Sequence, residues 1–349
     1  KNRKAEVLER VKTGECSILI GTHALLESDV VFDRLGFIII DEQHRFGVRQ
    51  RALLHEKGEH PDLLVMTATP IPRSLALTLY GDLDITSIRA KPRNRLPVRT
   101  LALPESRLSG VYRSVEKYIS EGRQAYFVYP IIEESSSIEL KSAINAFEIL
   151  KNDVFPDRRI DLLHGRLPSK DKDDIMRRFI AGEIDILVST TVIEVGIDVP
   201  NATIIVIQHP ERFGLSQLHQ LRGRVGRGEK QSFCVLVYPD EISAEAKRRI
   251  DVLVESDDGF RIAEEDLRMR GSGEFVGFQQ HGHGAGFEFA DLASDIDIIG
   301  LAREEAASIA QHIPDAGKVL KSLIEGAVPA GMPGLLNSLR KRKILSLLS

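Results

Sequence analysis

The sequence lacks the long apolar segments that a membrane protein or a secretory precursor needs. No apolar run approaches the ~18 residues of a membrane-spanning helix, and the opening stretch, KNRKAEVLER, has no apolar core of the kind found in a secretory signal. The 349 residues are 42% hydrophobic and 28% charged, which is typical of a globular protein with two or three domains. We therefore expect a cytoplasmic protein.

Cysteine and excess positive charge are also scarce. Only Cys16 and Cys234 occur, far apart in the chain, and each lies in a strand-like segment. We expect two buried thiols in a reducing compartment rather than a disulfide framework. The net charge of -4 provides no overall attraction to nucleic acid, so any such binding has to come from local basic patches.

A short repeat organises what the sequence does contain. GECSILIGT at residues 14–22 is matched by GEIDILVST at residues 182–190. In both copies a helical segment ends at a glycine and a short apolar strand ends in threonine. An Asp-Val pair follows each copy, at Asp29 and at Asp198, before another apolar run. The constant order of elements indicates that an α/β unit is duplicated.

Continuous apolar runs alternate with helical patterns, which is typical of a parallel sheet covered on both faces. One such helix places Val111, Val115 and Ile119 on one face and ends at Gly122. A basic, proline-containing stretch at residues 89–99 is expected to link the two copies, either as a solvated connector or near phosphates. The fold class is α/β. The expected strands are residues 18–20, 37–40, 63–66, 126–128, 161–163, 185–188, 203–207 and 234–237.

The two copies differ in the chemistry at their strand ends. Asp41 and Glu42 follow an apolar strand, at the edge where open parallel sheets bind ligands. Such a pair can hold Mg²⁺ and orient a water for phosphoryl transfer. The equivalent strand of the second copy reads IIVIQHP and has no carboxylate. This copy offers Arg222, Arg224 and Arg227 among glycines, either as phosphate ligands or as a solvated basic turn. Together they suggest a nucleotide held between two lobes.

At this point the residues resemble the motor of a helicase of the second superfamily. Each motif is short, but together, in this order, they are specific. DEQH at 41–44, TATPIPR at 67–73, STTVIEVGIDVP at 189–200 and QLRGRVGR at 220–227 are similar to motifs II, III, V and VI, and IGTHALLE at 20–27 and LLHGR at 162–166 are similar to DNA-contacting motifs.

Within the superfamily the chain most resembles the RecG family of branch-migrating DNA helicases, over residues 1 to about 300. DEQHRFGVRQR, HGRLPSKDKDDIMRRF and DGFRIAEEDLRMRGSGEFVGFQQHG (258–282) carry this resemblance, and the last is similar to the translocation motif shared by RecG and Mfd. The resemblance implies two RecA-like parallel-sheet lobes and a small C-terminal translocation region of helices and loops. The expected domains are residues 1–95 with motifs Ib, II and III, 96–255 with motifs IV, V and VI, and 256–349.

Roles carried over from the family fall on positions that match its motifs, with ATP and Mg²⁺ as cofactors. Asp41 is the expected Mg²⁺ ligand and Glu42 acts on the attacking water, while Gln43 and His44 link nucleotide state to DNA contacts. Thr67 and Thr69 relay that signal. Arg224 and Arg227 are the expected arginine fingers. Gly196, Asp198, Gln220 and Gly223 are the expected nucleotide contacts, and Thr22, His164, Gly165, Thr191, Arg261, Arg268 and Arg270 the expected DNA contacts.

The translocation segment has its own pattern. After Asp258, which suits a helix start, Phe260, Ala263 and Leu267 share an apolar face, whereas Arg261 and Arg268 lie on the opposite one. Glycines then follow. An amphipathic helix of this kind can present its arginines to duplex DNA, although the pattern alone is also that of an ordinary surface helix.

One departure from the family concerns the phosphate-cradling motif G-x-x-x-x-G-K-[ST], which is absent from the sequence. Since a helix begins almost directly at Lys1, we expect the chain to start inside the first lobe, to lack the family's N-terminal wedge domain and to hydrolyse ATP very poorly alone. QQHGHG at 279–284 has too few ligands for a metal site, and the RKRK run at 340–343 is expected to be solvated.

Three functions follow as hypotheses. The first is a RecG-like motor that acts on branched DNA, including Holliday junctions and stalled forks, in recombination and repair. The second is a duplex DNA translocase similar to Mfd. Such a protein is expected to have DEEH where this sequence has DEQH, and this difference counts against the second hypothesis. The third is a non-catalytic nucleic-acid-binding piece. The first hypothesis implies a monomeric bacterial motor that associates with the nucleoid when it acts and does not contact a membrane. A single-stranded-DNA-binding protein at forks is a further candidate partner.

Overall fold

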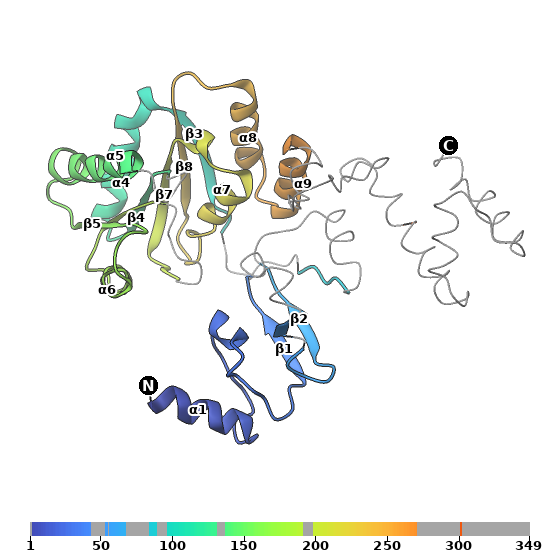
Figure 1. Ribbon diagram of the computed structural model, residues 1–349. Coiled ribbons are helices and arrows are strands. Elements are labelled where there is room, and N and C mark those ends of the chain that lie inside the picture. The colour runs from blue at the N-terminus through green and yellow to red at the C-terminus, as the bar shows by residue number, and fades with distance from the viewer. Residues whose placement is uncertain are drawn as a thin grey trace, which may run out of the picture. The chain divides into compact units, whose positions relative to one another are not determined.

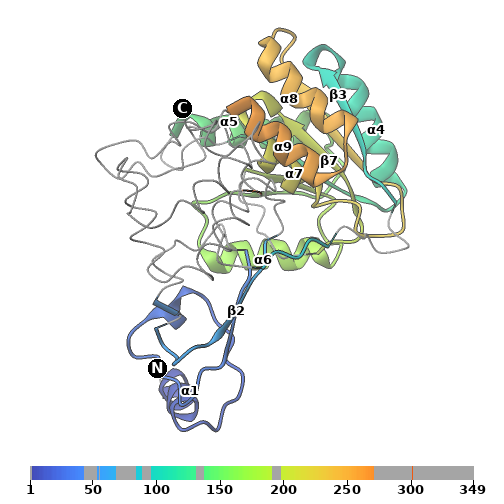
Figure 2. The same ribbon diagram turned by 90° about the vertical axis from the view of Figure 1, so that its right-hand side faces the viewer.

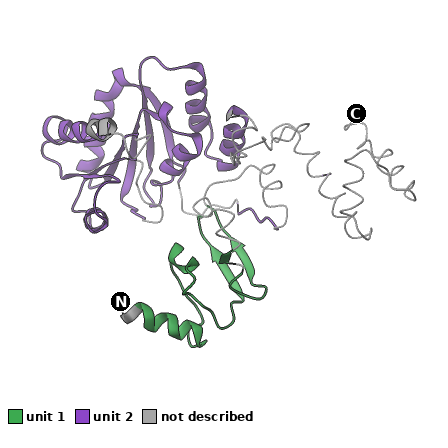
Figure 3. Ribbon diagram, viewed as in Figure 1, with its two compact units in different colours: residues 1–70 green, residues 71–349 purple. Residues whose placement is uncertain are grey.

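The computed structural model of the chain describes residues 2–42, 53–54, 56–67, 84–88, 96–130, 137–190, 198–270 and 301. The chain divides into two compact units, residues 1–70 and residues 71–349, which Figure 3 distinguishes by colour. None of the helices in the described part of the chain is both long and apolar enough to cross a membrane.

The first unit contains a small parallel sheet. Strands β1 (Phe37–Ile40) and β2 (Asp62–Val65) pair in parallel, with Phe37 opposite Asp62 and Ile40 opposite Val65. Ile38 and Ile40 point into the core of this unit, where Leu54 joins them. Helix α1 (Asn2–Lys12) and the short 3-10 helix η1 (His23–Leu26) precede the strands. Both strands were predicted from their apolar runs, and they are confirmed.

The strand expected at residues 18–20 is wrong. No strand occurs between α1 and η1 in the described chain, and Ile18 and Ile20 are 78% and 91% exposed. An apolar run becomes a strand only where a neighbour offers a hydrogen-bonding ladder, and no described strand pairs with this segment. The duplication therefore holds for the helix and its terminal glycine, Gly14, but not for the strand that follows. Cys16 lies in this irregular segment, partly exposed, rather than in a strand.

The second unit is built on a six-stranded, fully parallel sheet in the order β3-β8-β7-β4-β6-β5 (Figure 1). The strands are β3 (Arg99–Pro104), β4 (Gln124–Val128), β5 (Ile160–Leu163), β6 (Ile186–Ser189), β7 (Ala202–Gln208) and β8 (Phe233–Tyr238). Helices α4 (Leu108–Ser120), α5 (Ser137–Ile149), α6 (Ser169–Ile180), α7 (Leu215–Arg222), α8 (Ala244–Glu255) and α9 (Gly259–Arg270) connect or follow them, with short helical turns η3 (Glu105–Arg107), η4 (Leu150–Val154) and η5 (Pro210–Arg212).

Helices cover both faces of this sheet. One apolar cluster joins the sheet to α6, α7, α8 and α9, and a second joins it to α4 and to η4 at the end of α5. Figures 1 and 2 show α7, α8 and α9 grouped side by side, in agreement with the contacts among them. Every residue of β4, β6 and β7 is buried. This explains why these strands read as unbroken apolar runs in the sequence.

Most of the expected elements of this unit are confirmed, but β3 was missed. None of its residues is fully buried, and exposed and partly buried residues alternate over Arg99–Ala102, as suits a strand at the sheet edge. It starts at Arg99, within the stretch expected to be a connector. Gly122 and Gly182 end α4 and α6 with φ values of 79° and 75°, as the sequence predicted. Cys234 is fully buried in β8, and burial raises its pKa to about 12. The parallel α/β class is confirmed.

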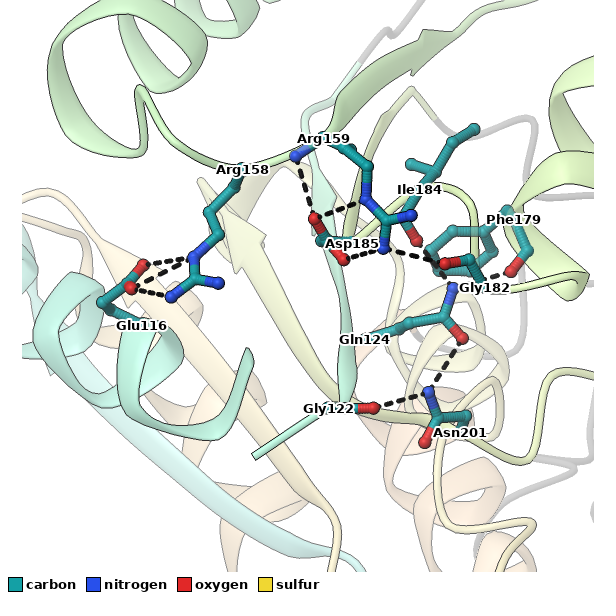
Figure 4. A network of polar contacts seen from close by, with 10 residues as sticks. All are labelled: Glu116, Gly122, Gln124, Arg158, Arg159, Phe179, Gly182, Ile184, Asp185 and Asn201. Carbon is teal, nitrogen blue, oxygen red and sulfur yellow. Dashed lines mark hydrogen bonds and ion pairs between the residues drawn. The ribbon is translucent and has the colours of Figure 1, made fainter. Parts of the chain in front are cut away.

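A buried amide fastens the amino-terminal edge of the second unit's sheet (Figure 4). The Nε2 group of Gln124, at the start of β4, donates to the carbonyl oxygens of Phe179 (2.6 Å) and Ile184 (2.7 Å). Its Oε1 accepts from Nδ2 of Asn201 at 3.1 Å, and that amide also donates to the Gly122 carbonyl at 3.0 Å. Gln124 and Asn201 together thus join the ends of α4 and α6 to the start of β7.

Two arginines extend this network at the surface. Arg159 donates to Asp185 at 2.6 Å and to the Gly182 carbonyl at 2.9 Å, and Arg158 forms an ion pair with Glu116 of α4. The hydrogen bond from Arg158 lowers the pKa of Glu116. Exposed pairs of this kind are worth about 0–1 kcal/mol each, so the buried amide makes the larger contribution.

Replacing Gln124 with methionine, which is similar in length but has no amide, is expected to destabilise the protein. The two carbonyls would lose their side-chain donor inside the core, and each such loss costs roughly 1–3 kcal/mol. The free energy of unfolding, measured by urea titration with far-UV circular dichroism, should fall by roughly 2–4 kcal/mol.

Asn152→Ala provides the control, because it removes only the exposed hydrogen bond from Asn152 to Glu148 at 3.0 Å. A surface change of this kind should alter the free energy of unfolding by less than about 0.5 kcal/mol. Similar losses in the two variants would show that the buried amide contributes no more than a surface bond.

Candidate functional site

The carboxyl ends of parallel strands gather at one edge of a sheet, and ligands bind outside that edge. In the second unit the strand order changes direction at β4, since β6 lies on one side of it and β7 on the other. The segments that leave β6 and β7 therefore flank the switch point of the sheet. Motif V follows β6 at this edge. The loop of motif VI follows α7 and leads into β8 at Phe233, so it lies at the opposite, amino-terminal edge, where Val98 precedes β3 and Pro200 precedes β7.

Asp41 and Glu42 follow β1 directly in the first unit. Ile40 before them is 2% exposed, whereas Asp41 is exposed and its Oδ1 accepts a hydrogen bond from the Glu42 backbone N–H at 2.8 Å. Glu42 has a φ of 51°, in the left-handed region. That conformation is costly for a residue with a side chain and concentrates at functional sites. An exposed carboxylate at a strand end suits the hard-oxygen preference of Mg²⁺.

The strand equivalent to β1 in the second unit, β7, is also followed by a left-handed residue, although it comes first after the strand rather than second. His209, immediately after β7, has a φ of 52°, and His209 and Glu42 are the non-glycine residues with positive φ in the described chain. The repeat itself makes His209 equivalent to Asp41, so the backbone agrees at the level of the strand ends and not of single residues. As the sequence predicted, the second copy has no carboxylate at this position.

The structure adds two carboxylates that the repeat did not reveal. Glu211 Oε1 lies 3.2 Å from Nδ1 of His209, and Glu105 Oε1 lies 3.5 Å from its Nε2. The hydrogen bond to Glu211 raises the pKa of His209, burial opposes it and the charge of Glu105 adds to it. Glu105 comes from the end of β3, a strand that was itself missed, so no sequence signal pointed to this cluster.

Arg222, one of the three arginines considered as phosphate ligands, has a structural role instead. Its side chain is 4% exposed at the end of α7, and Nη1 donates to the carbonyls of Leu253 (2.8 Å) and Ser256 (2.7 Å) at the end of α8. Nη2 lies 2.9 Å from Nδ1 of His219. Burial lowers the pKa of Arg222. A buried cation at the C-terminal carbonyls of a helix stabilises that helix end.

Arg224 and Arg227 lie in the loop that follows α7. The Nε group of Arg227 donates to the Gly223 carbonyl at 3.1 Å and lies 3.8 Å from Oδ1 of Asp198. Arg224 is 8% exposed. Burial raises the pKa of Tyr126 in β4, and the charges of both arginines oppose that shift. The structure therefore brings Asp198, Gly223, Arg224 and Arg227 together, next to Gln220 at the end of α7.

A smaller basic cluster lies at the end of β5. His164 follows this strand and begins the turn that leads through Arg166 to α6, with its backbone carbonyl accepting from Leu167 at 3.2 Å. Burial lowers the pKa of His164, and the charges of Lys172 and Arg166 lower it further. Positive charge thus surrounds the expected DNA contacts His164 and Gly165.

Helix α9 has the amphipathic character expected of the translocation segment. Asp258 Oδ1 accepts from the Phe260 backbone N–H at 2.9 Å at the helix start. Ala263 and Leu267 are buried, while Arg261 and Arg268 are exposed and pair with Glu255 and Glu265. Ser216 Oγ of α7 donates to the buried Asp266 at 2.9 Å, which fixes α9 on α7.

The remaining expected residues are only partly described. Thr22 precedes η1 and is exposed, and Thr67 is exposed just after β2. Within the described ranges no group of three or more His, Cys, Asp or Glu side chains could hold a metal ion, so the Mg²⁺ expectation rests on Asp41 and the phosphates. Gln43, His44, Thr69, Thr191, Gly196, the side chain of Arg270 and the QQHGHG and RKRK runs lie outside the described residues.

Comparison with known proteins identifies the parts of the chain. Residues 1–78 match the DEAD/DEAH box helicase family, residues 111–229 the helicase conserved C-terminal domain, and residues 256–325 the family described as ATP-dependent DNA helicase RecG, domain 3, C-terminal.

Curated relatives and a solved structure agree with these matches. The chain is 51% identical to the ATP-dependent DNA helicase RecG of Thermotoga maritima over 88% of this chain and 39% of the relative, and 47% identical to that of Escherichia coli over 89% and 46%. It also resembles the structure of RecG bound to a three-way DNA junction, with a TM-score of 0.66 and 47% identity, over 85% of this chain and 38% of that one. The chain thus spans less than half the length of these relatives.

The raised pKa of His209 makes stability depend on pH in a defined direction. Since the folded pKa lies above the ordinary value of about 6.5, the stabilisation from His209 is fully present below that value. It is lost as pH rises through the folded pKa. Replacing His209 with glutamine should therefore cost free energy of unfolding near pH 6 and much less near pH 8.5, as urea titrations at both pH values would show.

His164→Gln is the matched comparison, because its pKa is shifted in the opposite direction. Neutral His164 is favoured in the fold, so its removal should help most when pH falls below about 6.5. A His209→Gln effect of equal size at both pH values would contradict the assigned ion pairs.

Proposed function

Because this chain belongs to the RecG family, we propose that it is the motor part of an ATP-dependent DNA helicase that acts on branched DNA. The observation that carries the proposal is the contrast between two equivalent strand ends. Both have a left-handed residue within two positions of the end of a parallel strand, at Glu42 and at His209, but only the first carries an Asp-Glu pair. The second copy instead holds the arginine loop, at the amino-terminal edge of its sheet. A single ATP site formed by two lobes requires metal-binding carboxylates from one lobe and phosphate-binding arginines from the other.

Each side chain then has a defined task in phosphoryl transfer. Mg²⁺, when bound with ATP, neutralises charge on the phosphate oxygens. Asp41 supplies an exposed oxygen ligand for that ion, and Glu42, fixed by its left-handed backbone, orients the attacking water. Arg224 and Arg227 stabilise charge that develops on the transferred phosphoryl group, and such arginines are worth about 10³–10⁵ in rate. Asp198, 3.8 Å from Arg227, limits the directions in which that guanidinium points.

Movement along DNA is proposed to use the second lobe and α9. The cluster of His164, Arg166 and Lys172 provides positive charge for a phosphate backbone. On α9, Arg261 and Arg268 are exposed on the face opposite its packing contacts. Since Ser216 and Asp266 join α7 to α9, a shift of the motor core can be passed to α9. The domain limits 1–95, 96–255 and 256–349 fit this division, and the family matches at 1–78, 111–229 and 256–325 support them.

Two other functions remain to be separated by experiment. An Mfd-like duplex translocase would move on unbranched DNA and would unwind forks poorly, whereas the RecG-like motor unwinds them. A non-catalytic binding piece would bind DNA but would not turn over ATP even when extended at its N-terminus to the length of the relatives. We place the protein in the bacterial cytoplasm, as a monomer on DNA, with single-stranded-DNA-binding protein as a candidate partner at forks.

In the N-terminally extended protein, Asp41→Asn and Arg227→Ala are each expected to abolish DNA-stimulated ATP turnover while sparing DNA binding. Loss of the carboxylate weakens Mg²⁺ binding, and loss of the guanidinium removes about a thousandfold or more in rate. Phosphate release and fork binding, measured on the same samples, test both effects.

Asp153→Asn and Arg177→Ala are matched controls, because both side chains are exposed and lie outside the proposed site. They should retain the turnover of the unmodified protein. Unchanged ATP turnover in Asp41→Asn or Arg227→Ala would contradict the role assigned to that residue.

Arg166→Ala should weaken DNA binding uniformly across sequences rather than abolish it. One fewer phosphate contact lowers the slope of log affinity against log salt concentration by about 1. Fluorescence anisotropy of a labelled fork at several salt concentrations gives this slope. Arg177→Ala is again the comparison, and an unchanged slope in Arg166→Ala would remove Arg166 from the DNA surface.

A further inference from the structure

The loop that carries Arg224 and Arg227 lies against the segment that leads into β3. Gly226, between the two arginines, is buried and has a φ of 78°. A Cβ atom placed on Gly226 would lie 2.5 Å from Cγ2 of Val98, so a methyl group at this position and the Val98 side chain cannot coexist in this arrangement. Val98 also packs against the apolar cluster beneath α6–α9. The Val98 side chain therefore limits how closely the backbone of the loop at Gly226 can approach the segment before β3.

Hydrogen bonds hold the same segment to the chain beyond the loop. Nε2 of Gln231 donates to the Pro97 carbonyl at 2.8 Å and to the Ser232 carbonyl at 3.1 Å. The Arg99 backbone N–H donates to the Ser232 carbonyl at 2.9 Å, which begins the pairing of β3 with β8. Val98 is thus fixed from both sides by contacts that do not involve the arginines.

This contact bears directly on the two arginines because Gly226 lies one residue before Arg227 and two after Arg224. Arg227 is otherwise held by the Gly223 carbonyl within the loop and by Asp198. A displacement of about 1 Å in a group that acts on the reacting atoms costs about a hundredfold in rate. The position of the Val98 side chain therefore sets how well both guanidiniums are placed.

We propose that Val98 is a positioning residue for the arginine loop, acting as a steric stop on Gly226, with Gln231 fixing the segment that carries it. The inference rests on the proposed roles of Arg224 and Arg227. Residues 96–98 are the end of the basic stretch that leads from the first-lobe motifs into the second lobe. The segment thus adds to its linking role a second one, which is to place the arginines that act on ATP.

A double-substitution cycle in the N-terminally extended protein tests this stop. Gly226→Ala should lower kcat about a hundredfold, because the added methyl group pushes the loop off Val98 and an alanine is strained at the positive φ of this position. Val98→Ala should lower kcat about tenfold, because the loop loses its stop. In the double variant the methyl group introduced at position 226 occupies the space of the lost Cγ2, with its nearest neighbours at 3.9 Å. Its kcat should exceed that of Gly226→Ala at least about tenfold, while KM for ATP stays nearly constant.

Gly228→Ala is the matched control within the same loop. A Cβ atom there would lie 2.7 Å from the Pro200 carbonyl, so Val98→Ala should not rescue it. The proposal would be overturned if the double variant lost kcat by the product of the two single losses. It would also be overturned if Val98→Ala restored the kcat of Gly228→Ala as much as that of Gly226→Ala. If Gly226→Ala does not fold, Gln231→Leu tests the proposal instead, because it removes the hydrogen bond to the Pro97 carbonyl without straining the backbone. A lower kcat is expected in this variant. An unchanged kcat in that variant would also overturn the proposal.

Arg227→Ala, measured in the same series, separates the two levels of inference. Full turnover in Arg227→Ala would remove the proposed role of the arginines. An inactive Arg227→Ala together with multiplying losses in the Val98–Gly226 pair would leave that role intact and refute only the steric stop.

Discussion

The constraint on which the second unit depends is that a parallel sheet must be buried on both faces. β4, β6 and β7 have no exposed residue, and helices cover the sheet from either side. Apolar side chains therefore fill the interior of the strands, and groups that bind charged ligands are left at the strand ends and in the loops beyond them. Asp41, His164 and His209 each follow directly after a strand.

Several of the charged groups near the arginine loop hold the scaffold in place. Arg222 donates to the carbonyls at the end of α8, and Asp266 accepts from Ser216. These contacts fix α7, α8 and α9 against one another, so the loop after α7 starts from a rigid base. Arg227 is restrained by one carbonyl and one carboxylate, and Gly226 by the side chain of Val98. Preorganisation of this kind lets a guanidinium stabilise developing charge without first rearranging.

The sequence was sufficient for features that depend on local pattern. The buried strands could be read from apolar runs, the ends of α4 and α6 from Gly122 and Gly182, and the faces of α9 from the spacing of Ala263 and Leu267. The prediction for residues 18–20 failed because strand formation depends on a pairing partner, which a local pattern does not show. β3 was missed for the converse reason, since β8 supplies its hydrogen-bonding ladder although the apolar pattern of β3 is weak.

Contacts between residues distant in sequence could not be predicted, because a local pattern does not show which segments meet in the fold. Nothing near Arg222 in the sequence distinguishes it from Arg224, yet Arg222 is bound to the end of α8. The contact of Val98 with Gly226 likewise joins residues that lie 128 positions apart in the sequence.

The central claim is that Asp41 and Arg227 act on the same nucleotide, and single-turnover ATP hydrolysis by the extended protein tests it most directly. Groups that act as a unit on one transition state show strongly non-additive losses. The account expects the double variant Asp41→Asn/Arg227→Ala to hydrolyse ATP no more slowly than the slower single variant. A rate reduced by the product of the two separate losses would mean that the carboxylate and the guanidinium work independently, and would contradict it.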